Sequence, residues 1–189
     1  MSKPPRSALS VRDMVGAVVV LVVLALFVAG VSRSCTFAPG GPQVDQAATP
    51  TIDAAADLRR YAGEVPFPVR VPELPEGWRA NSSGLDRVAD GSDERVVRVG
   101  YLTVANRFLR LLQGTASEEQ LLRAQAGGAA VGAQGPVDVD GTRWVVYTAD
   151  EPIWIADAGE VRYLITGSAS EADFRALAEA VQQAPVVGR

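Results

Sequence analysis

Two pairs of neighbouring acidic residues are the groups in this sequence that could act together on a substrate. Asp138 and Asp140 lie two residues apart, and Asp150 and Glu151 are adjacent. Many glycosidases use two carboxyl groups, one as a general acid and the other as a base or nucleophile. Asp138 and Asp140 also belong to a sequence typical of a tight hairpin turn, where aspartate is favoured for backbone geometry alone. We therefore assign no catalytic residue, and an envelope hydrolase or transferase that uses a carboxylate pair stays an alternative.

Other familiar catalytic arrangements lack their residues. The chain has no histidine, so Ser-His-Asp and Cys-His catalysis are excluded and the commonest metal ligand is missing. A Ser-Lys dyad fails because the only lysine is Lys3, near the N-terminus. The single cysteine, Cys35, excludes an internal disulfide and a cysteine-rich metal site. It could be free, link two copies of the chain or carry a lipid.

A group of acidic residues in the middle of the chain could attract Ca²⁺. Its spacing fits no EF-hand loop, so we interpret the group as a solvated acidic turn. We expect neither a metal nor a cofactor. The residues concerned are Asp86, Asp90, Asp93 and Glu94.

Three tryptophans are the largest side chains of the C-terminal part. They are Trp78, Trp144 and Trp154. Tryptophans contribute much buried area to protein cores, and this is the interpretation we prefer. Ligand platforms use the same side chain, so a binding groove is the alternative.

Short amphipathic helices are predicted where a capping residue precedes apolar residues at helical spacing. Asp53 or Thr51 can cap the first helix, Ser117 the second and Ser170 the third. The third has the clearest apolar stripe, at positions i, i+3, i+4 and i+7. This stripe is Phe174, Leu177, Ala178 and Val181.

Strands are predicted between these helices, in an order of about three strands, a helix, about four strands and a helix. Tight turns join several of them, notably Asp140-Gly141, and such turns require antiparallel pairing. The fold class is therefore α+β with a mainly antiparallel sheet and about three helices. Residues 129–136 are predicted to be a loop of small residues. The strands are expected at 78–88, 95–104, 107–113, 137–139, 142–148, 153–156 and 161–166.

One uncharged apolar run near the N-terminus, from Met14 to Val31, predicts a single transmembrane helix at residues 14–32. More basic residues precede the run than follow it, so the N-terminus is expected in the cytoplasm and the C-terminal part outside. A cleaved signal peptide and a lipoprotein processed at Cys35 are the alternatives. Both alternatives fit poorly. The candidate cleavage sites, Ala29-Gly30-Val31 and Val31-Ser32-Arg33, are poor matches to the A-x-A pattern, and Ser32-Arg33-Ser34 places an arginine where a lipoprotein needs small or apolar residues.

The remaining domain boundaries follow from composition. Residues 1–13 form a cytoplasmic tail, residues 33–52 are rich in Gly and Pro and predict a flexible stalk, and residues 53–189 are long enough for one extracytoplasmic domain.

The charge balance restricts the partners. Of 18 basic and 22 acidic residues, four basic and one acidic residue lie before Cys35, so the rest of the chain carries a net charge of about −7. Such a domain is not expected to bind nucleic acid or an anionic membrane surface. All but one of the basic residues are arginine, which is typical of a GC-rich genome and suggests a bacterium.

Several short strings occur in a recognisable order around the single apolar run. Together they resemble the actinobacterial single-pass membrane proteins called domain of unknown function 4245, over nearly the whole chain. This resemblance implies a cell-envelope protein and carries no catalytic residue with it. The strings are Arg12-Asp13-Met14, Leu74-Pro75-Glu76-Gly77-Trp78, Val99-Gly100-Tyr101, Gly141-Thr142-Arg143-Trp144 and Gly167-Ser168-Ala169-Ser170.

The function predicted from the sequence is a non-enzymatic binding or interaction module of the cell envelope. Residues 14–32 would contact the lipid bilayer, and the outer domain would bind a protein or a cell-wall component. A sensor that acts through a membrane partner is a further alternative, since the string before the last helix looks like sensor modules of some anti-sigma and sporulation proteins.

Overall fold

The structure is a computed structural model that describes residues 11–31, 50–88 and 93–188. The chain divides into two units between residues 44 and 45, and each is described by itself. Cys35, the Asp90-Gly91 turn and most of the predicted stalk lie outside the described residues.

Helix α1 (Val11–Val31) covers the apolar run of the N-terminal unit. Its described valine and leucine side chains are at least half exposed. No helix in the described part of the chain is both long enough and apolar enough to cross a membrane. The predicted transmembrane helix at residues 14–32 is therefore not confirmed.

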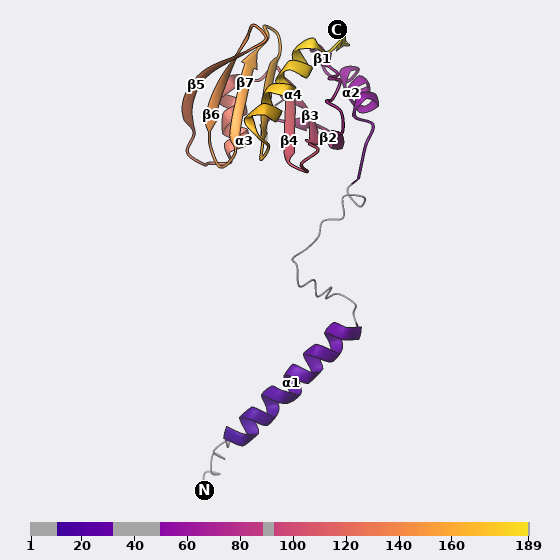
Figure 1. Cartoon of the computed structure of the whole chain (residues 1–189), viewed down its shortest axis with the longest axis vertical. Helices are drawn as coiled ribbons and strands as arrows, with labels where there is room; N and C mark the ends of the chain where they lie inside the picture. Colours follow the sequence, from indigo (N-terminus) through magenta and orange to yellow (C-terminus); the bar gives the residue numbers. More distant parts are fainter. Residues whose placement is uncertain (1–10, 32–49, 89–92, 189) are drawn as a thin grey trace. The chain divides into compact units, whose positions relative to one another are not determined.

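The second unit is built on a seven-stranded antiparallel sheet (Figure 1). Its spatial order is β2-β3-β4-β8-β7-β6-β5, so two meanders of consecutive strands meet where β4 pairs with β8. Strands β2 and β5 form the two edges. The strands are β2 (Arg79–Arg87), β3 (Arg95–Leu102), β4 (Phe108–Gly114), β5 (Gly132–Val139), β6 (Thr142–Thr148), β7 (Pro152–Asp157) and β8 (Arg162–Gly167).

Three helices of this unit begin at the predicted capping residues. Asp53 caps α2 (Ala54–Ala62), and its carboxylate accepts from the backbone N–H of Ala56 at 2.9 Å. Ser117 and Ser170 form capping boxes at α3 (Glu118–Ala126) and α4 (Glu171–Gln183). The predicted α+β class with a mainly antiparallel sheet is confirmed, and the described residues hold four helices including α1.

The helices cover the two faces of the sheet unequally. Helices α2 and α4 pack on one face, where Val97, Val99 and Tyr101 of β3 point, as their alternation predicts. Helix α3 packs on the opposite face through Leu121, over the middle of the sheet. Figure 1 shows α4 in front of the strands and α3 behind them. The larger core, between the sheet and the α2–α4 layer, includes the four predicted apolar residues of α4.

Two very short strands close the end of the larger core. Strand β1 (Val69–Arg70) pairs with β9 (Val186–Val187). The buried Gln113 of β4 joins this small ladder to the sheet, because its amide bonds both the N–H and the C=O of Arg70 at 2.8 Å. The proline-rich sequence before β1 gives no strand signal, so this ladder was not predicted.

The prediction of a loop at residues 129–136 is wrong in part. Strand β5 begins at Gly132, and its register shifts between Ala133 and Gly135. Glycine, alanine and proline have low strand propensity, so nothing in the local sequence indicates a strand. Pairing with β6 imposes it, and the bulge accommodates the poor strand formers at a sheet edge.

Candidate functional site

The first carboxylate pair belongs to a turn. Asp140 and Gly141 both have positive φ, 47° and 77°, as the predicted type I′ turn requires. The carboxylate of Asp138 accepts from the N–H of Gly141 at 3.2 Å. Both aspartates are exposed, and neither lines any of the three hollows described below. Turn geometry accounts for the pair.

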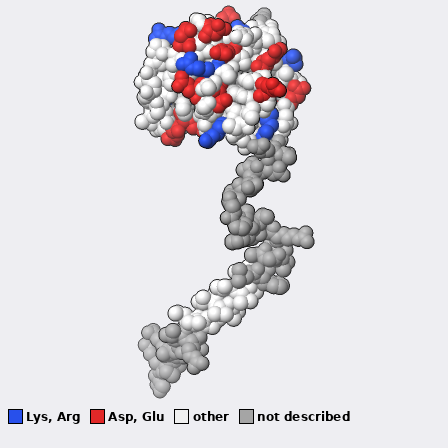
Figure 2. Space-filling model, in the orientation of Figure 1, with Lys and Arg blue, Asp and Glu red and all other residues white. Residues whose placement is uncertain are grey.

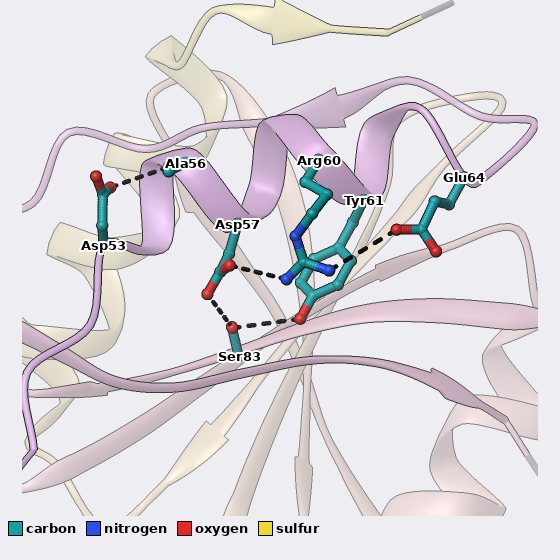
Figure 3. Close-up of polar contacts among 7 residues, drawn as sticks. All are labelled: Asp53, Ala56, Asp57, Arg60, Tyr61, Glu64 and Ser83. Atoms are coloured by element: carbon teal, nitrogen blue, oxygen red, sulfur yellow. Dashed lines mark hydrogen bonds and ion pairs between the residues drawn. The ribbon is translucent and has the colours of Figure 1, made fainter.

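A polar cluster joins helix α2 to the edge strand β2 (Figure 3). Ser83 donates to the carboxylate of Asp57 at 2.6 Å, and the Tyr61 hydroxyl lies 3.4 Å from Ser83 Oγ. The guanidinium of Arg60 bonds the other oxygen of Asp57 at 2.8 Å and lies 4.5 Å from the centre of the Tyr61 ring. A serine next to a carboxylate invites comparison with an activated nucleophile.

The electrostatics of this cluster argue against that chemistry. The hydrogen bond from Arg60 and then the one from Ser83 hold the pKa of Asp57 below its ordinary value. A carboxylate with a lowered pKa is a weak base and does not remove the proton of a serine. The described chain also provides no histidine between them. The cluster is a clamp that fixes α2 on the sheet.

We expect Asp57→Asn to flatten the acid end of the stability profile. The folded pKa is lowered, so the stabilisation is present above the unfolded value of 3.8 and is lost as pH falls through the folded pKa. The variant should be less stable than wild type at neutral pH, because it loses the charged hydrogen bond from Arg60. Urea unfolding at several pH values measures this. Glu119→Gln, which breaks only the exposed pair with Arg123, should change stability by less than about 0.5 kcal/mol.

The candidate binding site is a groove of about 320 Å³ between the start of α4 and the strands β5, β6 and β7. Trp154 and Phe174 form its floor, with ring centres 5.4 Å apart. Both rings are almost wholly buried, and small apolar side chains share the lining with them. The rest of the lining is Gln134, Gly135, Pro136, Val137, Val146, Tyr147, Thr148, Pro152, Ala169 and Glu171.

Arg175 connects α4 to the strands next to this groove. Its guanidinium is bound by Glu171 at 3.0 Å, lies 5.7 Å from the Trp154 ring and donates to the carbonyl of Asp138 at 3.2 Å. Its charge is thereby neutralised. Glu171 remains two-thirds exposed at the groove's edge.

Tyr147 contributes no acid or base to the groove. Its hydroxyl donates to the carboxylate of Glu118, at the start of α3. This hydrogen bond, with smaller effects of burial and charge, raises the pKa of Tyr147 to about 12. The groove is therefore apolar and aromatic, with polar groups only at its edge, as small-ligand and peptide sites commonly are.

The three tryptophans have different positions. Trp144 is completely buried, and its indole N–H donates to the amide oxygen of Gln182 at 2.8 Å when that amide is oriented to satisfy its neighbours. Trp154 is a core residue that also forms the groove floor. Trp78 lines a separate hollow of about 350 Å³ between the start of α2 and β2. The core interpretation is confirmed for Trp144 and Trp154, and the groove interpretation also applies to Trp154.

The groove was not predicted as a site, because most of its lining is individually unremarkable. Ala169 belongs to the string before the last helix, where only Ser170 carried an interpretable signal. Pro136 ends the loop predicted at residues 129–136, and Pro152 directly precedes the strand predicted at 153–156. In the described part of the chain, no three His, Cys, Asp or Glu side chains gather as a metal site.

Fold and site together define an α+β domain with an aromatic groove beside its C-terminal helix. A family model described as protein of unknown function (DUF4245) matches residues 6–181, and the chain belongs to this family. The predicted family is thus confirmed. The membrane location and the actinobacterial source, which the resemblance implied for this chain, stay predictions. Comparisons with curated proteins and with solved structures gave no match.

Proposed function

We propose that the protein is a membrane-anchored extracytoplasmic module that binds a protein or cell-wall partner through the groove beside α4, without catalysing a reaction. Residues 14–32 would lie in the bilayer, residues 1–13 in the cytoplasm, and residues 33–52 would connect the anchor to the outer domain, 53–189. The aromatic groove is the observation that carries the binding role.

The chemistry of the groove supports binding rather than turnover. Its volume is within the range of ligand pockets, about 300–1,000 Å³. Its only ionisable groups are Tyr147, whose hydroxyl is engaged by Glu118, and Glu171, which binds Arg175. A partner seated in the groove would gain free energy by burying the apolar lining that is still exposed, such as Pro136 and Pro152, because Trp154 and Phe174 are already almost wholly buried.

The surface charge supports a partner other than nucleic acid. Figure 2 shows acidic side chains outnumbering basic ones on the face drawn. A polyanion would be repelled there.

A binding experiment tests the groove. The full-length protein is cross-linked in native membranes, purified in detergent, and its partners are compared with those of Ala169→Trp, which places a large side chain in the groove. We expect about tenfold less partner or worse with this variant. The matched control is Ala124→Trp, on the exposed side of α3 across the sheet, which should keep the partner. Equal capture by both variants, each folded, would reject the groove.

The single cysteine tests the membrane topology directly. Cys35 is expected just outside the bilayer, so a membrane-impermeant maleimide should label it in intact cells. In the background Cys35→Ser, a new cysteine from Ser2→Cys should be labelled only after lysis. Labelling of Ser2→Cys in intact cells, or recovery of the chain in the soluble fraction, would contradict the anchored topology.

A further inference from the structure

A third hollow lies at the C-terminal end of α3 and takes no part in the proposed function. It measures about 100 Å³. Polar side chains reach it from three separate elements: Gln125 from the last turn of α3, Asp150 and Glu151 from the bend before β7, and Thr166 from β8. It contains the second carboxylate pair of the sequence, for which the groove offers no use.

The Thr166 hydroxyl is the most informative group in this hollow. Thr166 is 1% exposed, and its Oγ1 has no hydrogen-bond partner in the described part of the chain. Buried hydroxyl groups in folded proteins nearly always have a partner, because an unpaired one has lost its bonds to water. Ile153, its cross-strand neighbour on β7, also lines the hollow, so the two side chains point the same way. The unpaired hydroxyl is therefore available to an occupant of the hollow.

The available donor atoms specify the chemistry of that occupant. Two carboxylates, an amide oxygen and a hydroxyl are all oxygen ligands, which hard cations prefer. Helix α3 ends here, and the carbonyl end of the helix dipole makes the local potential more negative. Arg110, the strand partner of Thr166, projects from the same face of the sheet, and its Nε is also buried without a partner among the described residues. It is not part of the lining, and its guanidinium lies over the Phe108 ring, 5.5 Å from the centre.

We propose that this hollow binds one Ca²⁺ ion, with Asp150, Glu151, Gln125 and Thr166 as its side-chain ligands and water completing the coordination. One water needs about 10–15 Å³ of such volume, so 100 Å³ holds an ion with part of its hydration shell. Calcium fits better than magnesium, because ligands on an exposed bend are flexible and Ca²⁺ tolerates irregular geometry. Two carboxylates place the affinity in the weak class of extracellular modules, with a Kd of about 10⁻⁴–10⁻³ M.

Calcium titration of the full-length protein in nonionic detergent, after treatment with a chelator, tests the site. We expect saturable binding by calorimetry and a thermal midpoint that rises with Ca²⁺ concentration. Asp150→Asn with Glu151→Gln should weaken binding by about tenfold or more. The matched control, Asp138→Asn with Asp140→Asn, removes the same charge from the β5–β6 turn and should leave the affinity unchanged.

Thr166→Val separates a ligand from a mere packing residue. Valine has the same shape without the hydroxyl, so this variant should be at least as stable as wild type without Ca²⁺ and should respond less to Ca²⁺. Absence of saturable binding up to about 10 mM, ten times the weakest expected Kd, would overturn the proposal. Equal loss of affinity in the two double variants would also overturn it. None of these measurements depends on the groove or on the topology, so the two proposals fail separately.

Discussion

Gly167→Ala is expected to destabilise the domain by about 3–5 kcal/mol, through backbone strain of 1–3 kcal/mol added to overpacking of similar size. Gly167 has φ of +146°, a conformation that L side chains rarely adopt. A Cβ atom there would lie 2.2 Å from the carbonyl oxygen of Phe108, which also accepts from the N–H of Ser168 at 2.9 Å. The obstacle is backbone of the central β4–β8 pair, so no side chain can move aside.

The control for this variant is Gly135→Ala. Gly135 also lies in a strand and also has a positive φ, +114°. A Cβ atom at Gly135 would meet no other atom within 4 Å. Urea unfolding should show a loss of about 1–2 kcal/mol, from backbone strain alone. If the two variants were equally destabilised, the close approach at Gly167 would contribute nothing.

Gln113→Leu should destabilise the domain by about 2–5 kcal/mol, because two partly buried backbone groups each lose a partner worth about 1–3 kcal/mol. Gln113 is completely buried, and its amide bonds both backbone groups of Arg70. The side chain of Arg70 in turn bonds the Tyr163 hydroxyl and the carbonyls of Gln182 and Ala184, at 2.8 Å each. The loss therefore reaches the end of α4.

Denaturant unfolding measures this loss, and Gln183→Leu is its control. Gln183 is exposed and its amide bonds Asp140 at 3.4 Å, so its substitution should change stability by no more than about 0.5 kcal/mol. Equal losses in the two variants would show that burial of the Gln113 amide is not the cause.

Local chemistry made the helices and several turns predictable. A capping box needs residues three positions apart, and the Ser117 and Ser170 boxes form as their spacing requires. The Asp140-Gly141 turn needs only two residues that tolerate positive φ. The face of β3 that carries Val99 followed from alternation along a single strand.

Pairing and geometry between distant segments were not predictable in the same way. The β4–β8 pair joins Leu109 to Gly167, and the local sequence of neither strand indicates which strand it pairs with. The Asp57–Ser83 bond crosses 26 positions of sequence. The short β1–β9 ladder exists because the two segments meet at the end of the core, although neither has a strand pattern.

The candidate sites show the same division. Sequence analysis identified Trp154 as a possible groove residue, but offered no reason to prefer it over the other two tryptophans. It also identified the pair Asp150 and Glu151, with no reason to prefer this pair over Asp138 and Asp140. The groove exists because α4 begins beside β5, β6 and β7, and the small hollow exists because α3 ends near Thr166.

Taken alone, the sequence determined the residue chemistry present, the apolar N-terminal run, the acidic charge of the remainder, the family and the α+β class. These depend on composition and on contacts between near neighbours in the chain. Tertiary structure decided the strand order, the groove and the unpaired Thr166 hydroxyl. Each of those depends on distances between segments far apart in sequence, which are set by how helices and sheet pack as a whole.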